Sequence, residues 1–349
     1  MLRTKIVVAL AALAVLASAC AGGTDSAKKE DGSYVIKYMQ ASDSFAYLPF
    51  FVALNEGYFD GENVEIDRQP NVGQSAEAAQ AVSTGAVGIG SIGTTGAYAA
   101  ESSGRDLVGL ATMTKQSLIE VVLSAKAADK AAKAGVTPDS PIEDRIDALK
   151  GLKIAIVPEG SISRVQFEAA LREYGVDPDK DATLLPIQDP AALVASVREG
   201  QADAFVFTLP NTRQAAADDF GVTWISYPRG DVPVLKDQYL IDIVATKAYV
   251  EKNKEAVEAF MRAIWKAVEL IKSDPDKARA AAKESFPDME DAIFDPAFDA
   301  SVAAFTDGLV PEEAGFQATF DLFNGTLDKP TELDFATAYD TEIVESTQP

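Results

Sequence analysis

The 349-residue sequence contains no histidine and only one cysteine, Cys20. Without histidine, the protein lacks the most common general base, the usual zinc ligand and any Ser-His-Asp triad. A single cysteine excludes disulfides within the chain, paired redox cysteines and cysteine-rich metal sites. No metal site and no cofactor are therefore predicted. Lysine chemistry and hydrolysis by paired carboxylates stay open on composition alone.

Positive charge is also scarce, with 31 Lys and Arg against 54 Asp and Glu and a net charge of -23. Nucleic-acid binding depends on the neutralisation of phosphates by Lys and Arg, so no nucleic-acid partner is expected. A small anionic ligand stays possible, because its binding depends on the local field rather than on net charge. Hydrophobic residues make up 47% of the chain, which is enough for a sizeable core.

The N-terminus has the pattern of an export signal. Arg3 and Lys5 precede an uncharged apolar stretch, residues 6–19, which is shorter than the roughly 20 residues of a membrane-spanning helix. The stretch ends in "LASAC", which resembles the lipobox of bacterial lipoproteins, although Ala17 stands where Leu, Val or Ile is usual. The alternative is a plain secretory signal with an incidental cysteine.

We therefore predict a lipoprotein signal peptide over residues 1–19 and a polar, flexible tether over residues 20–33. In this prediction Cys20 is diacylated and becomes the mature N-terminus. The protein is then extracytoplasmic and is anchored to the cell membrane by the lipid on Cys20.

Strand-like and helix-like segments alternate after residue 34, as expected for βαβ units. The first series of predicted strands covers 34–39, 63–69, 86–90, 106–112 and 118–124. The second covers 153–157, 182–186, 203–207 and 222–226, followed by one more strand at 239–246 and an almost wholly helical C-terminal part. This pattern predicts an α/β fold with mostly parallel sheets flanked by helices.

The two series indicate two lobes. Lobe I is predicted to comprise residues 34–115 and 238–349, from both ends of the chain, and lobe II residues 116–237. The Ala- and Lys-rich residues 125–149 are predicted to form an excursion on the surface.

In open parallel sheets, ligands bind beyond the carboxyl ends of the strands, where loops lead into helices. In this sequence those loops combine Gly with Ser or Thr, cations, and aromatic rings such as Phe207. The cations are Lys115, Arg164, Arg213 and Arg229. The predicted ligand-binding residues are Ser42, Asp43, Phe45, Tyr47, Ser91, Thr94, Thr95, Lys115, Ser161, Ser163, Arg164, Thr208, Asn211, Arg213 and Tyr227.

The stretch "GSISR", residues 160–164, is the sharpest of these loops. The first turn of a helix offers N–H donors without an internal partner, so this loop could hold an oxyanion by backbone N–H, hydroxyl and guanidinium. Each residue also has an ordinary interpretation. Ser161 fits a helix N-cap, Arg164 a solvated surface charge, Phe45 the core, and Asp43 either a partner for a ligand ammonium or plain loop chemistry.

Six blocks of sequence between residues 34 and 285 carry a resemblance to a known family. They are "LPFFVALNEGYFDGENVEI", "AAQAVSTGAVGIGSIG", "LKGLKIAIVPEGS", "LREYGVDPDKDATLLPI", "ALVASVREGQADAFVFTLP" and "ATKAYVEKNKEAVEAFMRAIWKAVE". The chain resembles the substrate-binding proteins of ABC importers for nitrate, sulfonates and taurine, with relatives for thiamine-precursor pyrimidines. The resemblance implies a two-lobed, type II periplasmic-binding-protein-like fold that closes by hinge motion. It also implies a monomer that delivers a small-molecule ligand to an ABC permease driven by a cytoplasmic ATPase.

Carried over to this chain, the ligand loops fall at 42–47, 91–95, 113–116, 161–164, 208–213 and 227–229. Some relatives in the wider superfamily are enzymes that build a pyrimidine, with a cysteine-rich iron-binding cluster and an essential histidine. This chain has neither, so that pyrimidine-building activity is not expected, and the protein is predicted to be a non-catalytic receptor rather than an enzyme.

The cations favour a small organic anion as the solute: a sulfonate, a taurine-like compound or an aromatic carboxylate. The alternatives are a neutral pyrimidine or vitamin precursor, where Asp43 or Asp242 would meet an amino group, and nitrate or bicarbonate. Two other classes are an extracytoplasmic enzyme with paired carboxylates and a structural lipoprotein.

Overall fold

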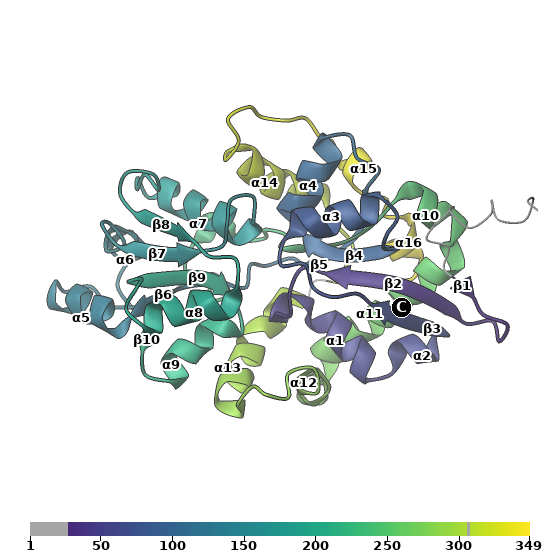
Figure 1. Ribbon diagram of the computed structural model, residues 1–349, viewed down its shortest axis with the longest axis horizontal. Helices are drawn as coiled ribbons and strands as arrows, with labels where there is room; N and C mark the ends of the chain where they lie inside the picture. Colours follow the sequence, from purple (N-terminus) through teal and green to yellow (C-terminus); the bar gives the residue numbers. More distant parts are fainter. Residues whose placement is uncertain (1–26, 306–307) are drawn as a thin grey trace, which may run out of the picture.

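The strands assemble into two sheets, one toward each end of the molecule (Figure 1). The computed structural model describes residues 27–305 and 308–349, so the predicted signal peptide and Cys20 lie outside the described residues. Helices flank both sheets, which confirms the α/β, two-lobed architecture predicted from the alternation of segments.

The first sheet contains strands from both halves of the chain. Its order is β3–β2–β4–β11–β5, and the short β1 also pairs with one end of β2. The strands are β1 (Ala27–Lys28), β2 (Tyr34–Gln40), β3 (Val64–Arg68), β4 (Ile89–Gly93), β5 (Val108–Thr114) and β11 (Ile241–Ala245). Apart from β1, only β11 runs against the common direction, because it is antiparallel to both of its neighbours.

The second sheet repeats this plan with order β8–β7–β9–β6–β10. Its strands are β6 (Ile119–Ser124), β7 (Lys153–Ile156), β8 (Thr183–Pro186), β9 (Ala204–Thr208) and β10 (Gly221–Ser226). Here β6 is the reversed strand, in the same place as β11 in the first sheet. Each sheet is therefore mixed. Most of its strands share one direction, as predicted, but the reversed strand next to the edge is antiparallel to both of its neighbours.

The chain passes between the sheets twice, at residues 115–118 and at residues 227–240. The two crossings touch, since the Gln116 side-chain amide donates to the carbonyl of Pro228 at 3.1 Å. Each crossing leads into a reversed strand. Two strands therefore carry the connections between the lobes and place the carboxyl ends of both sheets toward the junction.

Helices cover both faces of the first sheet (Figure 1). On one side lie α1 (Leu48–Asn55), α2 (Tyr58–Gly61), α11 (Lys254–Ser273) and α12 (Pro275–Lys283), and on the other α3 (Ser75–Ser83) and α4 (Thr94–Ser102). The apolar stripe of α11, from Val257 to Ile271, is buried as its helical spacing predicts. On the same side, Tyr38 of β2 stacks on Phe50 of α1 with ring centroids 4.1 Å apart.

In the second lobe, α7 (Ile162–Glu173) and α8 (Pro190–Arg198) pack on the central strand β9. The predicted stripe of α7 is buried at Phe167, Ala170 and Leu171. Residues 125–149 contain two helices, α5 (Ala125–Lys133) and α6 (Ile142–Asp147), and both pack near β10. The remaining short elements of this lobe are η2 (Asn211–Arg213), α9 (Gln214–Ala217) and η3 (Pro233–Leu235).

C-terminal helices lie at the junction of the lobes, above and below it in Figure 1. The helix α13 (Asp291–Ser301) packs on η1 (Phe45–Tyr47) and also on η2 and α9. The helix α14 (Glu313–Asn324) packs on α4 and also on α7. The C-terminal part, which is predicted to belong to lobe I, therefore contacts helices of both lobes. The chain ends with α15 (Phe335–Ala338) and α16 (Glu342–Ser346).

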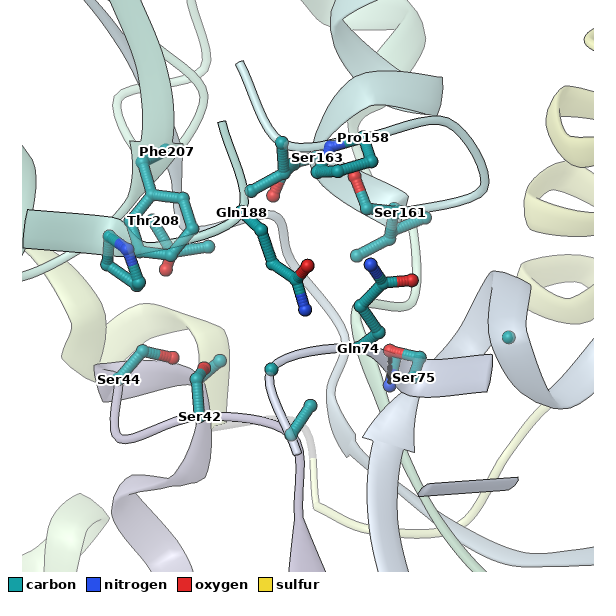
Figure 2. Close-up of a pocket in the computed structure, with 18 of the residues that line it drawn as sticks. Ser42, Ser44, Gln74, Ser75, Pro158, Ser161, Ser163, Gln188, Phe207 and Thr208 are labelled. Atoms are coloured by element: carbon teal, nitrogen blue, oxygen red, sulfur yellow. Dashed lines mark hydrogen bonds between the residues drawn. The ribbon is translucent and has the colours of Figure 1, made fainter. Parts of the chain in front are cut away.

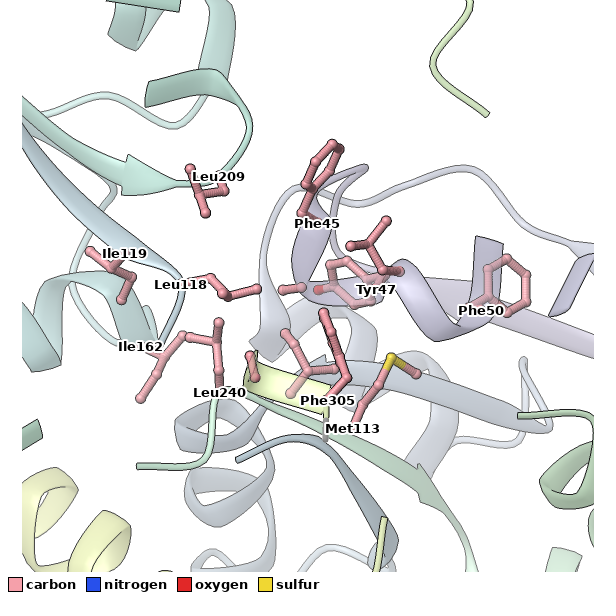
Figure 3. Close-up of a cluster of buried hydrophobic side chains, with 14 of the residues drawn as sticks. Phe45, Tyr47, Phe50, Met113, Leu118, Ile119, Ile162, Leu209, Leu240 and Phe305 are labelled. Carbon is pink, nitrogen blue, oxygen red and sulfur yellow. The ribbon is translucent and has the colours of Figure 1, made fainter. Parts of the chain in front are cut away.

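One hydrophobic cluster extends through the junction (Figure 3). Phe45, Met113 and Phe305 from the first lobe meet Leu118 and Leu209 from the second. The apolar contact between the lobes is therefore continuous with the cores of both.

Two local expectations need correction. The strand predicted at 86–90 is β4, Ile89–Gly93, so Ser91 lies within a strand and not in a loop. Residues 27–33 are predicted as part of the tether, but they form β1 and a turn. The strand β1 pairs with β2, and in the turn the Lys29 N–H donates to the Ser33 carbonyl at 2.8 Å. Among the described residues, no helix is both long enough and apolar enough to cross a bilayer.

Candidate functional site

A cavity of about 530 Å³ lies between the two lobes. The loops after β2, β7, β8 and β9 line it, together with the first turns of α3, α7 and α8. Figure 2 shows its polar side chains, with Ser42, Ser44, Gln74 and Ser75 on one wall. The opposite wall carries Ser161, Ser163, Gln188, Phe207 and Thr208. This is the edge of the fold where the position of the strand ends predicts a ligand.

Part of the predicted set comes together in this cavity. The predicted residues that line the cavity are Ser42, Asp43, Tyr47, Ser161, Ser163, Thr208 and Asn211. They come from both lobes, so a solute in the cavity would touch both.

Helix starts supply much of the lining. Ser161 is the N-cap of α7, where its hydroxyl accepts from Arg164 N–H at 3.3 Å. Asp189 is the N-cap of α8 and accepts from Ala192 N–H at 2.7 Å. The start of α3, at Gln74, has no side-chain cap. First turns of helices therefore line the cavity from both lobes, and the backbone N–H groups of a first turn carry partial positive charge.

The predicted cations do not line the cavity. Arg164 donates to Glu168 at 2.7 Å, and Arg213 donates to buried Glu120 at 2.6 Å. Lys115 pairs with Glu312 at 3.0 Å. Arg229 likewise pairs with Asp231 at 2.6 Å. In the described structure a carboxylate therefore pairs with each of the four predicted cations, and none of them belongs to the lining.

Three other predicted residues are buried in the fold and do not line the cavity. Phe45 meets Phe286 and Phe294 edge-on, with centroids 5.2 and 5.0 Å away, so the core interpretation holds for it. Ser91 is fully buried within β4. Tyr227 is also buried, its hydroxyl has no partner among the described residues, and burial raises its pKa.

The pair Thr94 and Thr95 begins α4 behind the cavity wall. Thr94 is fully buried, and its N–H donates to the Leu240 carbonyl at 3.2 Å. Thr95 donates from its hydroxyl to the carbonyl of Gly160 in the second lobe at 3.2 Å. Thr95 thus links the lobes and does not line the cavity.

The cavity also contains four residues that lie outside all the predicted loops, namely Asn71, Gln74, Ser75 and Gln188. Ser44 also lines it and lies within the predicted loop 42–47, although it is not among the predicted residues. Gln74 and Gln188 lie in loops that follow β3 and β8. The rule that ligands bind at strand carboxyl ends applies to these two loops as well. These two loops lack the combination of small residues, cations and rings that marks the other loops, so that combination does not predict them.

The lining contains no Lys or Arg, and its three carboxylates are already engaged. Asp43 forms an ion pair with Arg68 and accepts from the Gln40 amide at 2.8 Å. Glu159 pairs with Arg164 at 3.2 Å, and Asp189 caps α8. The groups left to meet a solute are uncharged: hydroxyls, carboxamides and backbone N–H.

Two sheets of the same strand order, joined by two crossings and enclosing a cavity at their strand ends, define a periplasmic-binding-protein-like fold. The chain belongs to the NMT1-like family, whose model matches residues 41–284.

Solved structures support the fold. The alkanesulfonate-binding protein SsuA from Xanthomonas axonopodis pv. citri, bound to MOPS, is 16% identical, with a TM-score of 0.65 over 90% of this chain and 98% of that one. The periplasmic nitrate-binding protein NrtA from Synechocystis PCC 6803 is 15% identical, with a TM-score of 0.57 over 80% of this chain and 74% of that one. At these identities the likeness shows that the chain shares the fold of both proteins.

A sequence relative has a different name. The 4-amino-5-hydroxymethyl-2-methylpyrimidine phosphate synthase of Aspergillus parasiticus is 23% identical over 74% of this chain and 73% of its own length. The chain is therefore similar both to proteins named as binding proteins and to a protein named as a pyrimidine synthase.

Proposed function

We propose that this protein is the extracytoplasmic solute-binding component of an ABC importer. It captures a small organic anion between its lobes and delivers it to the permease, without making or breaking a bond in the solute. The observation that carries the proposal is the cavity of about 530 Å³, which both lobes line with helix starts. A volume in this range suits a small-molecule ligand.

An anion in this cavity would be held without a cationic side chain. The first turns of α3 and α7 reach it from opposite lobes, and helix N-termini bind anions through free N–H groups and the helix dipole. Micromolar affinity corresponds to about 8 kcal/mol. Hydrogen bonds to a charged group contribute roughly 1.5–3 kcal/mol each, so three to five such bonds are enough.

An uncharged polar solute is the second candidate. The specific observation in its favour is the neutral lining, since every predicted cation is paired elsewhere. Relatives named as pyrimidine synthases agree with this class. Catalysis is not proposed, because the chain lacks histidine and the lining acids Asp43, Glu159 and Asp189 are already engaged.

The experiment is a thermal-shift and calorimetric screen of a soluble form that begins after Cys20. The panel contains sulfonates, taurine, nitrate, bicarbonate, phthalate, benzoate and a hydroxymethylpyrimidine. A solute at a hundredfold over its dissociation constant should stabilise the protein by about 2.7 kcal/mol. An anion as the best stabiliser supports the first candidate and the pyrimidine supports the second. Steady chemical turnover of any panel member would contradict the proposal.

The proposed membrane anchor is tested in cells. Cys20→Ser should move the protein from the membrane fraction to the soluble extracytoplasmic fraction, because the acylated thiol is lost. Ser18→Ala, which keeps the cysteine, is the matched control. Unchanged membrane association of the Cys20 variant would exclude the lipid anchor.

A further inference from the structure

Two side chains face each other in the middle of the cavity, one from each lobe. Gln188 extends from the second lobe toward the first, and Gln74 points into the same space from the start of α3 (Figure 2). Both end in a carboxamide, which donates and accepts hydrogen bonds without carrying charge.

The base of Gln188 is held firmly. Its neighbour Ile187 donates from its N–H to the Ile156 carbonyl at 2.8 Å, which continues the pairing of β8 with β7. Its other neighbour, Asp189, caps α8. Gln188 therefore projects from a fixed corner between a strand end and a helix start.

The surface that Gln188 meets is Gly73, in the loop before α3. Gly73 has a φ of +78°, and its N–H donates to the Ala41 carbonyl at 2.8 Å, which fixes the loop to the end of β2. A Cβ at this position would lie 3.2 Å from the side-chain nitrogen of Gln188, tighter than an ordinary contact. Glycine suits this backbone conformation and leaves Gln188 in its place, whereas a Cβ would require the Gln188 carboxamide to give by a few tenths of an ångström.

Two further contacts join the lobes around the cavity. Thr95 donates to the Gly160 carbonyl at 3.2 Å, and Phe45 N–H donates to the Leu209 carbonyl at 3.0 Å. In each of these contacts at least one partner lies outside the lining, because neither Phe45 nor Thr95 lines the cavity. Gln188 on Gly73 is different, since both residues belong to the lining.

We infer that Gln188 seated on Gly73 is the contact that closes the cleft at the solute, and that this closed arrangement is populated before a solute binds. The inference rests on the proposed function in one respect, because it assumes that the lobes open to admit a solute. Gln188 is then a positioning residue: it sets the lobe separation and, with Gln74, places two uncharged carboxamides against the captured molecule. The bare surface of Gly73 is what permits closure.

The test measures lobe separation without any solute. In the mature chain, Cys20→Ser removes the only cysteine, so spin labels can be placed at Gln80→Cys on α3 and Glu173→Cys on α7. Pulsed electron paramagnetic resonance then gives the distance distribution between the lobes. The wild-type background should show a population at the short distance of the closed structure.

Gly73→Asn should shift the distribution to longer distances. Asparagine tolerates a positive φ, so its main effect is the side chain pressed against Gln188. Gly57→Asn is the matched control, because Gly57 has a φ of +69° and nothing within 4 Å of its Cβ position. Gln188→Ala should also lower the closed population, and the double variant Gly73→Asn with Gln188→Ala should be no more open than either single variant, since both act on one contact.

Three results would overturn the inference: a wild-type distribution with only the long distance, equal shifts for the two glycine variants, or effects of Gly73→Asn and Gln188→Ala that simply add. None of them depends on a solute. A failed solute screen would count against the proposed function alone, and a failed distance experiment would count against the closing contact alone.

Discussion

The two sheets have the same plan but treat a buried acid at the same place in opposite ways. Glu120 is the second residue of β6, and Asp242 is the second residue of β11, the equivalent reversed strand. Both side chains are withdrawn from solvent, with Glu120 0% and Asp242 1% exposed. Equivalent positions in the two lobes therefore both carry a buried carboxyl group.

Their partners differ. Glu120 accepts from Arg213 at 2.6 Å, from Thr212 at 2.7 Å and from Ser226 at 2.8 Å. Asp242 accepts from the Tyr339 hydroxyl at 2.7 Å, and its Oδ1 has no partner among the described residues. The second lobe thus compensates its acid with a cation and two hydroxyls. In the first lobe, the hydrogen bond that compensates Asp242 comes from the hydroxyl of Tyr339 in the C-terminal segment.

The consequence appears in the protonation of Asp242. Burial raises the pKa of Asp242 to about 7, against the opposing effect of the hydroxyls of Tyr339, Thr112 and Thr94 beside it. Burial and the nearby Asp242 charge also raise the pKa of Glu101, on α4, to about 9. A carboxyl without a cation is most easily buried in its neutral form. The same strand position therefore holds an ion pair in one lobe and a proton in the other.

The largest expected effect is on the pH dependence of stability in the first lobe. Between the unfolded pKa of 3.8 and the folded value of about 7, the folded state keeps a proton that the unfolded state has released. The free energy of unfolding should therefore fall as pH rises through this window. A difference of about 3 pKa units corresponds to about 4 kcal/mol.

Asp242→Asn should remove this loss, because the amide stays neutral and still accepts from Tyr339. Urea unfolding at pH 4.5 and at pH 8 gives the free energy of unfolding of the variant and of the wild type. The difference between the two proteins at each pH tests the prediction. Glu101→Gln is the companion variant, and its difference should extend toward pH 9. Parallel profiles for Asp242→Asn and wild type would show that Asp242 is not protonated in the folded state.

The second expected effect breaks the compensated acid. Glu120→Ala leaves the Arg213 guanidinium and two hydroxyls without their acceptor. Breaking a buried ion pair costs about 3–5 kcal/mol, and about 3 kcal/mol is expected here because the Arg213 side chain is 25% exposed. Denaturant unfolding at pH 7 measures it. Glu120→Gln, which keeps an acceptor, should cost less, and Lys150→Ala, at an exposed pair, should cost nothing measurable. An equal cost for the Ala and Gln variants would mean that a neutral acceptor at residue 120 contributes nothing, and that the charge of Glu120 accounts for the whole effect.

The contrast also shows what the sequence could predict about the site. The partner of Arg213 is 93 residues away and that of Lys115 is 197 residues away, so nothing local to either residue indicates that it is paired. Arg164 is different. Its partners Glu159 and Glu168 are five and four residues away, and the spacing to Glu168 is that of a helical ion pair, which sequence analysis can recognise.

The fold was more accessible, because the alternation of apolar segments is a local property. The predicted strands match those of both sheets, and the largest shift, from 86–90 to Ile89–Gly93, has a tertiary cause. Gly88 lies under the ring of Tyr249, where a Cβ would come within 2.5 Å of that side chain. A glycine needed for packing on a distant helix is indistinguishable in sequence from a glycine within a strand. The local pattern therefore predicts the strand three residues too early, at 86–90 instead of Ile89–Gly93, and predicts a loop at Ser91.

The smallest expected effect compares one helix cap in each lobe. Ser161 caps α7 at the cavity, and Thr246 caps α10 (Lys247–Lys252) away from it, accepting from Tyr249 N–H at 3.0 Å. Ser161→Ala and Thr246→Ala should each lower the free energy of unfolding by about 1 kcal/mol, because each leaves a first-turn N–H without its acceptor.

The two cap variants should behave differently when the best stabiliser of the solute screen is added. The solute-induced rise in melting temperature should shrink for Ser161→Ala and stay at the wild-type value for Thr246→Ala, since only Ser161 lines the cavity. Calorimetry with the same solute should give a weaker affinity for the Ser161 variant alone. If both variants keep the full rise, the Ser161 hydroxyl serves only the helix, and the solute in the second lobe is held by backbone N–H and by other side chains.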